Sequence, residues 1–179
     1  MVLLFVFCTP LFGNHGVARA ETVTVGLFAP SAPFPSTAAR VELASKLGAA
    51  ISKALGGTAA TGKVFARSGD FQSAVKKGDV QIALVDAVYL ATAPGGYTVL
   101  ASAVRGGDTQ HRWQLVARGA EKLADLKGKR VLVPASGGRE TDFVLDVLLA
   151  GEVARDYFGK IETAPDTAST LAALGLGKA

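Results

Sequence analysis

The chain has 179 residues, of which 49% are hydrophobic and 19% are charged, so it can bury a core and is not disordered in bulk. Its formal net charge is +4. Because its Lys and Arg residues stand singly or in pairs, without interleaved aromatic residues, we expect no nucleic-acid partner.

The first twenty residues are predicted to be a cleavable export signal. Val2–Phe12 is an apolar run of the length of a signal core and too short to span a bilayer. Ala18-Arg19-Ala20 fits the small-x-small cleavage pattern, although no Lys or Arg precedes the apolar run. We therefore expect a periplasmic protein that begins at Glu21. Cys8, the only cysteine, lies in the signal, which excludes disulfides and thiol chemistry from the mature chain.

Residues 21–110 alternate predicted strands and helices. Strands are expected over Glu21–Phe28, Lys63–Arg67, Gln81–Asp86 and Tyr97–Val104, and helices from Ser36 or Thr37 to about Leu55, from Ser68 to about Lys77, and over Ala87–Ala93. This order predicts an α/β fold with a mainly parallel sheet and helices on both faces. Ligands of such sheets bind beyond the carboxyl ends of the strands, which singles out the loops after Phe28 and Asp86.

Residues 111–179 carry fewer predicted strands. We expect a strand at His111–Arg118 that crosses between lobes, a short helix at Lys122–Lys127, a strand at Arg130–Pro134, a helix over about Arg139–Ala150, a short strand within Phe158–Thr163, and a last helix capped by Asp166 or Thr167. Two strands outside the crossing segment are too few to cover these helices, which predicts an incomplete second lobe.

The turn at Ser136-Gly137-Gly138 is the feature most suggestive of ligand binding. It joins an apolar strand to a helix N-terminus, where backbone N–H groups and the helix dipole favour an anion. Glycine lets the backbone approach a ligand closely, and Ser136 offers a hydroxyl. The alternative is a purely structural helix cap.

Five segments in this order resemble the periplasmic substrate-binding proteins of ABC transporters, and the phosphonate- and phosphite-binding branch in particular. The segments are TVTVGLFAP, FQSAVKKGDVQIALVDAVYLA, HRWQLVAR, LADLKGKRVLVPASGG and APDTASTLAALGLGKA. The resemblance implies a two-lobed, type 2 periplasmic-binding fold that captures a small phosphonate- or phosphate-like oxyanion without catalysis or cofactor. It also implies an ABC permease of the inner membrane as partner. Residues 21–110 would form lobe one, and residues 111–179 the crossing strand and a lobe two truncated at its C-terminus.

The resemblance also implies which residues contact the ligand. They are Ser31, Phe34, Asp86, Tyr89, Ser136, Gly137, Gly138, Arg139 and Thr141. Structural alternatives stay open for several of them. Asp86 can be a helix cap, Tyr89 a core aromatic, and Ser31 and Phe34 parts of a surface loop. For Arg139 and Glu140 we favour an exposed first-turn pair, and for His111 and Trp113 a hinge or packing role.

Two other functions stay open beside solute uptake. A sensor or accessory protein would use the same binding fold to signal to a partner, and the sequence does not separate this from transport. A hydrolase with Ser136 as nucleophile is disfavoured, because the chain has no GxSxG elbow and no paired carboxylates. Two histidines, one of them in the signal, do not make a metal site, so no metal is expected.

Overall fold

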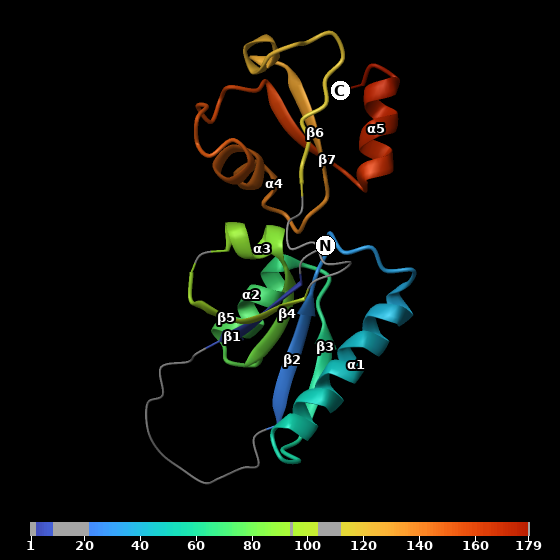
Figure 1. The fold of residues 1–179 in the computed structure, drawn as a ribbon, viewed down its shortest axis with the longest axis vertical. Coiled ribbons are helices and arrows are strands. Elements are labelled where there is room, and N and C mark those ends of the chain that lie inside the picture. Colours follow the sequence, from blue (N-terminus) through green and yellow to red (C-terminus); the bar gives the residue numbers. More distant parts are fainter. Residues whose placement is uncertain (1–2, 9–21, 94, 104–111, 179) are drawn as a thin grey trace. The chain divides into compact units, whose positions relative to one another are not determined.

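The computed structural model describes residues 3–8, 22–93, 95–103 and 112–178 (Figure 1). The described residues form an α/β protein in which most strand pairs are parallel, so the predicted fold class is confirmed at this level. The chain divides into two compact units, residues 1–110 (unit 1) and residues 111–179 (unit 2).

Unit 1 is built on a five-stranded sheet. Its strands are β1 (Leu3–Cys8), β2 (Val23–Phe28), β3 (Ala60–Val64), β4 (Ile82–Asp86) and β5 (Tyr97–Ala103), in the order β3-β2-β4-β1-β5. β2 runs parallel to β3 and β4, whereas β1 pairs antiparallel with both β4 and β5. The second predicted strand lies three residues earlier than expected. The segment Leu3–Cys8 of the predicted signal is thus a strand in this chain, while its role as an export signal stays a prediction.

Three helices cover this sheet: α1 (Thr37–Ala54), α2 (Ser68–Lys76) and α3 (Ala87–Thr92). α1 begins where predicted, because the Ser36 hydroxyl accepts a hydrogen bond from Ala39 N over 3.1 Å. It ends before Gly56, whose φ of 68° lies in the left-handed region that glycine adopts without strain.

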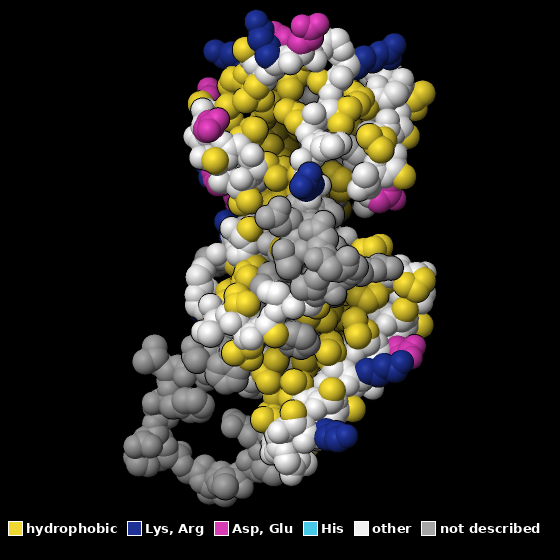
Figure 2. Space-filling view, in the orientation of Figure 1, with side chains coloured by type: hydrophobic (Ala, Val, Ile, Leu, Met, Phe, Trp, Pro, Cys, Tyr) yellow, Lys and Arg dark blue, Asp and Glu magenta, His cyan; other side chains and the backbone are white. Residues whose placement is uncertain are grey.

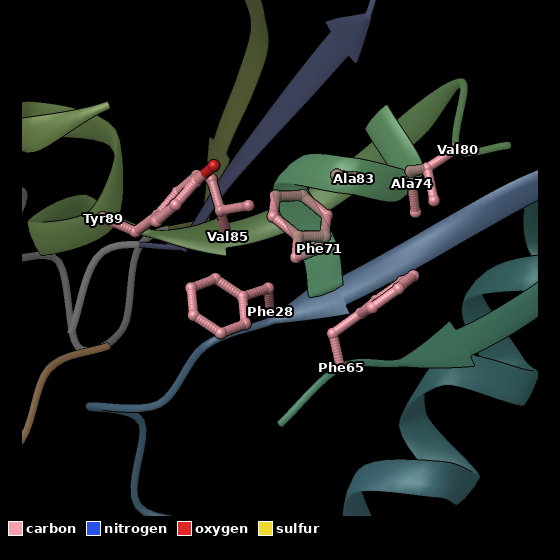
Figure 3. Packing of buried hydrophobic residues seen from close by; sticks show 8 residues of the cluster. All are labelled: Phe28, Phe65, Phe71, Ala74, Val80, Ala83, Val85 and Tyr89. Atoms are coloured by element: carbon pink, nitrogen blue, oxygen red, sulfur yellow. The ribbon is translucent and has the colours of Figure 1, made fainter. Parts of the chain in front are cut away.

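The core of unit 1 fills both faces of the sheet. On one face, Phe28 stacks on Phe71 with ring centroids 5.3 Å apart, and Tyr89 meets Phe28 edge-on at 5.0 Å (Figure 3). On the other face, α1 packs against Leu27 and Leu84. Burial of each large side chain contributes roughly 1.5–3 kcal/mol. β4 is buried along its whole length, as its apolar run Ile82–Val85 predicts, and this burial includes Asp86 at its end.

Unit 2 contains a two-stranded parallel sheet and little regular helix. Its elements are the 3₁₀-helix η1 (Leu123–Leu126), β6 (Arg130–Pro134), α4 (Glu140–Asp142), the π-helix η2 (Phe143–Leu148), β7 (Lys160–Ala164) and α5 (Thr167–Gly175). α5 begins at Asp166, whose carboxylate accepts a hydrogen bond from Ser169 N over 2.7 Å. The predicted cap is therefore confirmed.

Two sequence predictions for unit 2 are wrong. The crossing strand is not formed, because Arg112–Arg118 has no regular secondary structure; His111 lies outside the described residues. The predicted helix over Arg139–Ala150 is one α-helical turn followed by the π-helix. The three consecutive side chains Phe143–Leu145 are buried, a wider coverage than one face of an α-helix gives.

The core of unit 2 gathers around Val133, Val144, Leu145 and Phe158. Trp113 packs beside them and meets the Phe143 ring edge-on, with centroids 5.1 Å apart. This contact agrees with the packing role favoured for Trp113. In the part of the chain that the structure describes, no helix combines the length and the apolar character needed to cross a bilayer.

Candidate functional site

The turn after β6 encloses a carboxylate of the chain itself. Glu140 Oε1 accepts hydrogen bonds from Ser136 N over 2.7 Å and from Gly138 N over 3.0 Å, and the Ser136 hydroxyl lies 3.4 Å away. Both side chains are buried, with Glu140 8% and Ser136 4% exposed. The predicted anion-binding donors therefore do converge on one oxyanion, and that oxyanion belongs to Glu140.

The electrostatics of this turn favour the ionised carboxylate. Burial by itself would raise the pKa of Glu140, but hydrogen bonds from the backbone N–H groups of Gly138, Ser136, Glu140 and Gly137 outweigh burial, and the pKa is lowered. Gly137 and Gly138 have φ values of 114° and 96°, which few other residues adopt. The glycines thus give the turn the shape in which its N–H groups point at one oxygen.

Arg139 does not pair with Glu140 in an exposed first turn, so the favoured interpretation of these two residues is wrong. The Arg139 guanidinium instead donates to Asp142 from Nε over 3.1 Å and from Nη2 over 3.0 Å. Arg155 donates to the other oxygen of Asp142 over 2.9 Å. Hydrogen bonds from Arg155 and then Arg139 hold the pKa of Asp142 below its ordinary value. Thr141 is exposed beside this cluster.

Asp86 ties together the two loops that the sequence singles out in unit 1. One carboxylate oxygen accepts from Ser31 N over 3.0 Å and from the Ser31 hydroxyl over 2.8 Å, and the other accepts from Tyr89 N over 2.8 Å. Asp86 is 1% exposed and caps α3. Asp86 is thus a helix cap, as the structural alternative holds. It fixes the loop after β2 against the start of α3. Ser31 remains exposed on that loop.

The two predicted aromatic contacts lie on opposite faces of the sheet. Tyr89 is buried in the core (Figure 3). Its hydroxyl lies 2.7 Å from that of Tyr97. Phe34 is half-buried on the α1 side, with the Arg40 guanidinium 5.0 Å above its ring. The structure therefore brings Ser31, Asp86 and the Tyr89 backbone together and leaves Phe34 apart from them.

Sequence reasoning missed the role of Glu140. Its signal is a carboxylate two positions after a Gly-Gly pair and four after Ser136, one position further than in a standard capping box. Within residues 3–8, 22–93, 95–103 and 112–178, no group of three or more His, Cys, Asp or Glu side chains is arranged to hold a metal ion.

Comparison of the chain with protein-family models, with curated proteins and with solved structures finds no match.

Proposed function

We propose that this chain is the solute-binding component of an ABC-type uptake system and that it captures a small phosphonate- or phosphate-like oxyanion. The proposal rests on the resemblance of its five segments to periplasmic substrate-binding proteins. It includes a periplasmic location and an inner-membrane permease as partner.

One observation most directly supports an oxyanion as the ligand. The backbone of Ser136 and Gly138 places two N–H donors 2.7 and 3.0 Å from a single carboxylate oxygen. These are the distances of charge-assisted hydrogen bonds, which are about twice as strong as neutral ones. A turn that holds a carboxylate oxygen in this way also suits an oxygen of phosphonate or phosphate.

A solute that binds to this turn must replace Glu140. The Glu140 side chain is four residues from Ser136 in the same turn, so its effective concentration is high and a free anion competes with it poorly. A phosphonate compensates by offering three oxygens to the donors of Ser136, Gly137 and Gly138.

The test is calorimetry of the full chain with methylphosphonate, phosphite, methanesulfonate and glycine, beside a variant with Glu140→Ala. We expect methylphosphonate or phosphite to bind, and to bind the variant at least about tenfold more tightly because the competing carboxylate is gone. Glu152→Ala, at an exposed glutamate of the same unit, is the matched control and should bind as the unmodified chain does.

Fluorescence of Trp113, the only tryptophan, shows whether unit 2 remains folded in each variant. The proposal fails if none of the four solutes binds the full chain or the folded Glu140→Ala variant.

A further inference from the structure

A groove in unit 2 lies outside the candidate site. It has a volume of about 790 Å³ and runs between the segment Arg112–Ala120, the strand β6 and the helix α5. Apolar side chains that line it are strongly exposed: Leu115 52%, Val116 53% and Leu171 53%. Figure 2 shows hydrophobic side chains gathered on the face of unit 2 that it presents. Exposed apolar surface of this kind marks binding sites.

One wall of the groove is an open strand edge. β6 pairs with β7 and with no other strand among the described residues. Along a strand, the N–H and C=O of successive residues point alternately to its two sides. Lys129 O and Ala135 N bond toward the β7 side, to Gly159 N and Ala164 O. The backbone groups of Arg130, Leu132 and Pro134 must therefore point to the open edge.

Pro134 fits this assignment. Proline has no N–H, and within sheets it is tolerated where that N–H would face away from a neighbouring strand. The open edge of β6 thus offers the N–H groups of Arg130 and Leu132 and the carbonyls of all three residues. Its length of five residues is that of a typical short strand.

The opposite wall also has unpaired backbone. From Gln114 to Ala120, no backbone group bonds to the backbone of another residue in the part of the chain that the structure describes. The segment includes the apolar run Leu115–Ala117 and overlaps the strand that the sequence predicts at His111–Arg118. Two segments whose N–H and C=O groups lack backbone partners among the described residues suit an occupant that has a peptide backbone, which a lipid or an aromatic solute lacks.

The charge around the groove is positive. Arg112, Arg118, Lys129 and Lys178 line it and form no ion pair with the described residues. Arg130 is paired with Glu162. The acidic residue that lines the groove, Asp125, accepts hydrogen bonds from Glu121 N and Lys122 N and so caps η1. An occupant with acidic flanks complements this rim.

We infer that this groove binds an extended peptide segment of another protein, apolar in its centre and acidic at its ends, which adds a β-strand to the open edge of β6. The apolar centre covers Leu115, Val116 and Leu171, the backbone pairs with Leu132, and the acidic ends meet Arg112, Arg118, Lys129 and Lys178. Main-chain pairing supplies affinity in such complexes, and the side-chain contacts supply specificity.

The probe is a capped heptapeptide, EVTVIVE, titrated by calorimetry into the full chain. Two derivatives carry N-methyl groups on alternate residues, one set for each edge of the peptide strand. We expect at least one derivative to bind at least about tenfold more weakly, because it loses its hydrogen bonds to β6. Equal binding of all three peptides, or no binding of the unmodified one, would overturn the inference.

Two further measurements locate the peptide. Val116→Lys should abolish binding, whereas Val41→Lys, at a valine of unit 1 that is 54% exposed against 53% for Val116, should leave it unchanged. In hydrogen exchange, the Leu132 amide should become protected only with peptide present. An amide of Leu132 that is already protected in the free chain, or that exchanges equally fast with and without peptide, contradicts the open edge.

Discussion

At the scale of single residues, Gly62 decides how closely α1 approaches the sheet. A Cβ atom at Gly62 would lie 1.8 Å from the backbone oxygen of Ala44, and one at Gly48 would lie 2.7 Å from Gly62 N. Both obstacles are backbone atoms, which a change of rotamer cannot remove. We therefore expect Gly62→Ala to lower the free energy of unfolding by about 3 kcal/mol or more, measured by urea denaturation followed by circular dichroism.

Gly69→Ala is the matched control for this prediction. No heavy atom lies within 4 Å of the position that its Cβ would take, and the residue is in α2. Because alanine is the better helix former, this variant should be neutral or more stable by up to about 1 kcal/mol. A similar loss in both variants would show that the contact between α1 and β3 is not the cause.

Glu140 makes unit 2 sensitive to acid. Its folded-state pKa is lowered from 4.5, so the stability that its ionised form contributes is present above that value and is lost as the pH falls through the lowered pKa. Glu140→Gln should therefore lower the free energy of unfolding at pH 7 and flatten its dependence on pH below about 4.5. The measurement is urea unfolding between pH 2.5 and 7, followed by Trp113 fluorescence.

Other groups also contribute to this acid dependence, so the variant should reduce it and not abolish it. The pKa of Asp142 is lowered by hydrogen bonds from Arg155 and Arg139, and that of Asp166 by Ser169. Glu152→Gln, at an exposed side chain, serves as the control and should leave the pH profile as it is. If the free energy of unfolding falls equally steeply below about pH 4.5 with and without Glu140, Glu140 is not a source of the acid sensitivity.

At the scale of elements, Asp86 joins β4, α3 and the loop after β2. Asp86→Ala leaves Ser31 N, the Ser31 hydroxyl and Tyr89 N without their acceptor, and the site is buried. We expect a loss of about 3 kcal/mol in the free energy of unfolding, against about 1 kcal/mol for Ser31→Ala. The double variant should lose clearly less than the sum of the two, and strict additivity would contradict the shared hydrogen bonds.

The sequence predicts most elements of unit 1 because local signals and burial agree there. β4 contains the apolar run Ile82–Val85, and α1 has both a serine cap and a glycine stop. For Arg112–Arg118 the local sequence predicts a strand that is not formed, since a strand forms only when a neighbouring strand pairs with its backbone. The π-helix is equally invisible to a search for the 3.6-residue period.

For the candidate site, the sequence predicts the backbone N–H donors of the turn but not the Glu140 carboxylate that accepts their hydrogen bonds. Glycines and a serine after an apolar strand indicate backbone donors at Ser136 and Gly138. The spacing of Glu140 from Ser136 does not by itself show that its carboxylate folds back onto these donors, because that depends on the φ values of Gly137 and Gly138. Asp86 is the converse case: its position at a strand end suggests a ligand contact, while its hydrogen bonds go to Ser31 and Tyr89.

At the scale of the whole molecule, the sheet of unit 1 depends on a segment that the sequence assigns to export. β1 (Leu3–Cys8) lies between β4 and β5 and pairs with both. β5 has no other partner strand among the described residues, and its burial is slight, with Val99 and Leu100 47% and 57% exposed. Removal of residues 1–20 would therefore take away the element that joins β5 to the sheet.

Hydrogen exchange of two chains, residues 1–179 and residues 21–179, tests this dependence. In the shorter chain those amides of Tyr97–Ala103 that bond to β1 should exchange at least about 100-fold faster, because local opening then costs almost no free energy. The amides of β2 and β3 pair with each other in both chains and should keep their protection. Equal protection of β5 in both chains would mean that β1 is dispensable, as a cleaved signal must be. Faster exchange would mean that loss of β1 leaves open the edge of β4 that β1 otherwise covers.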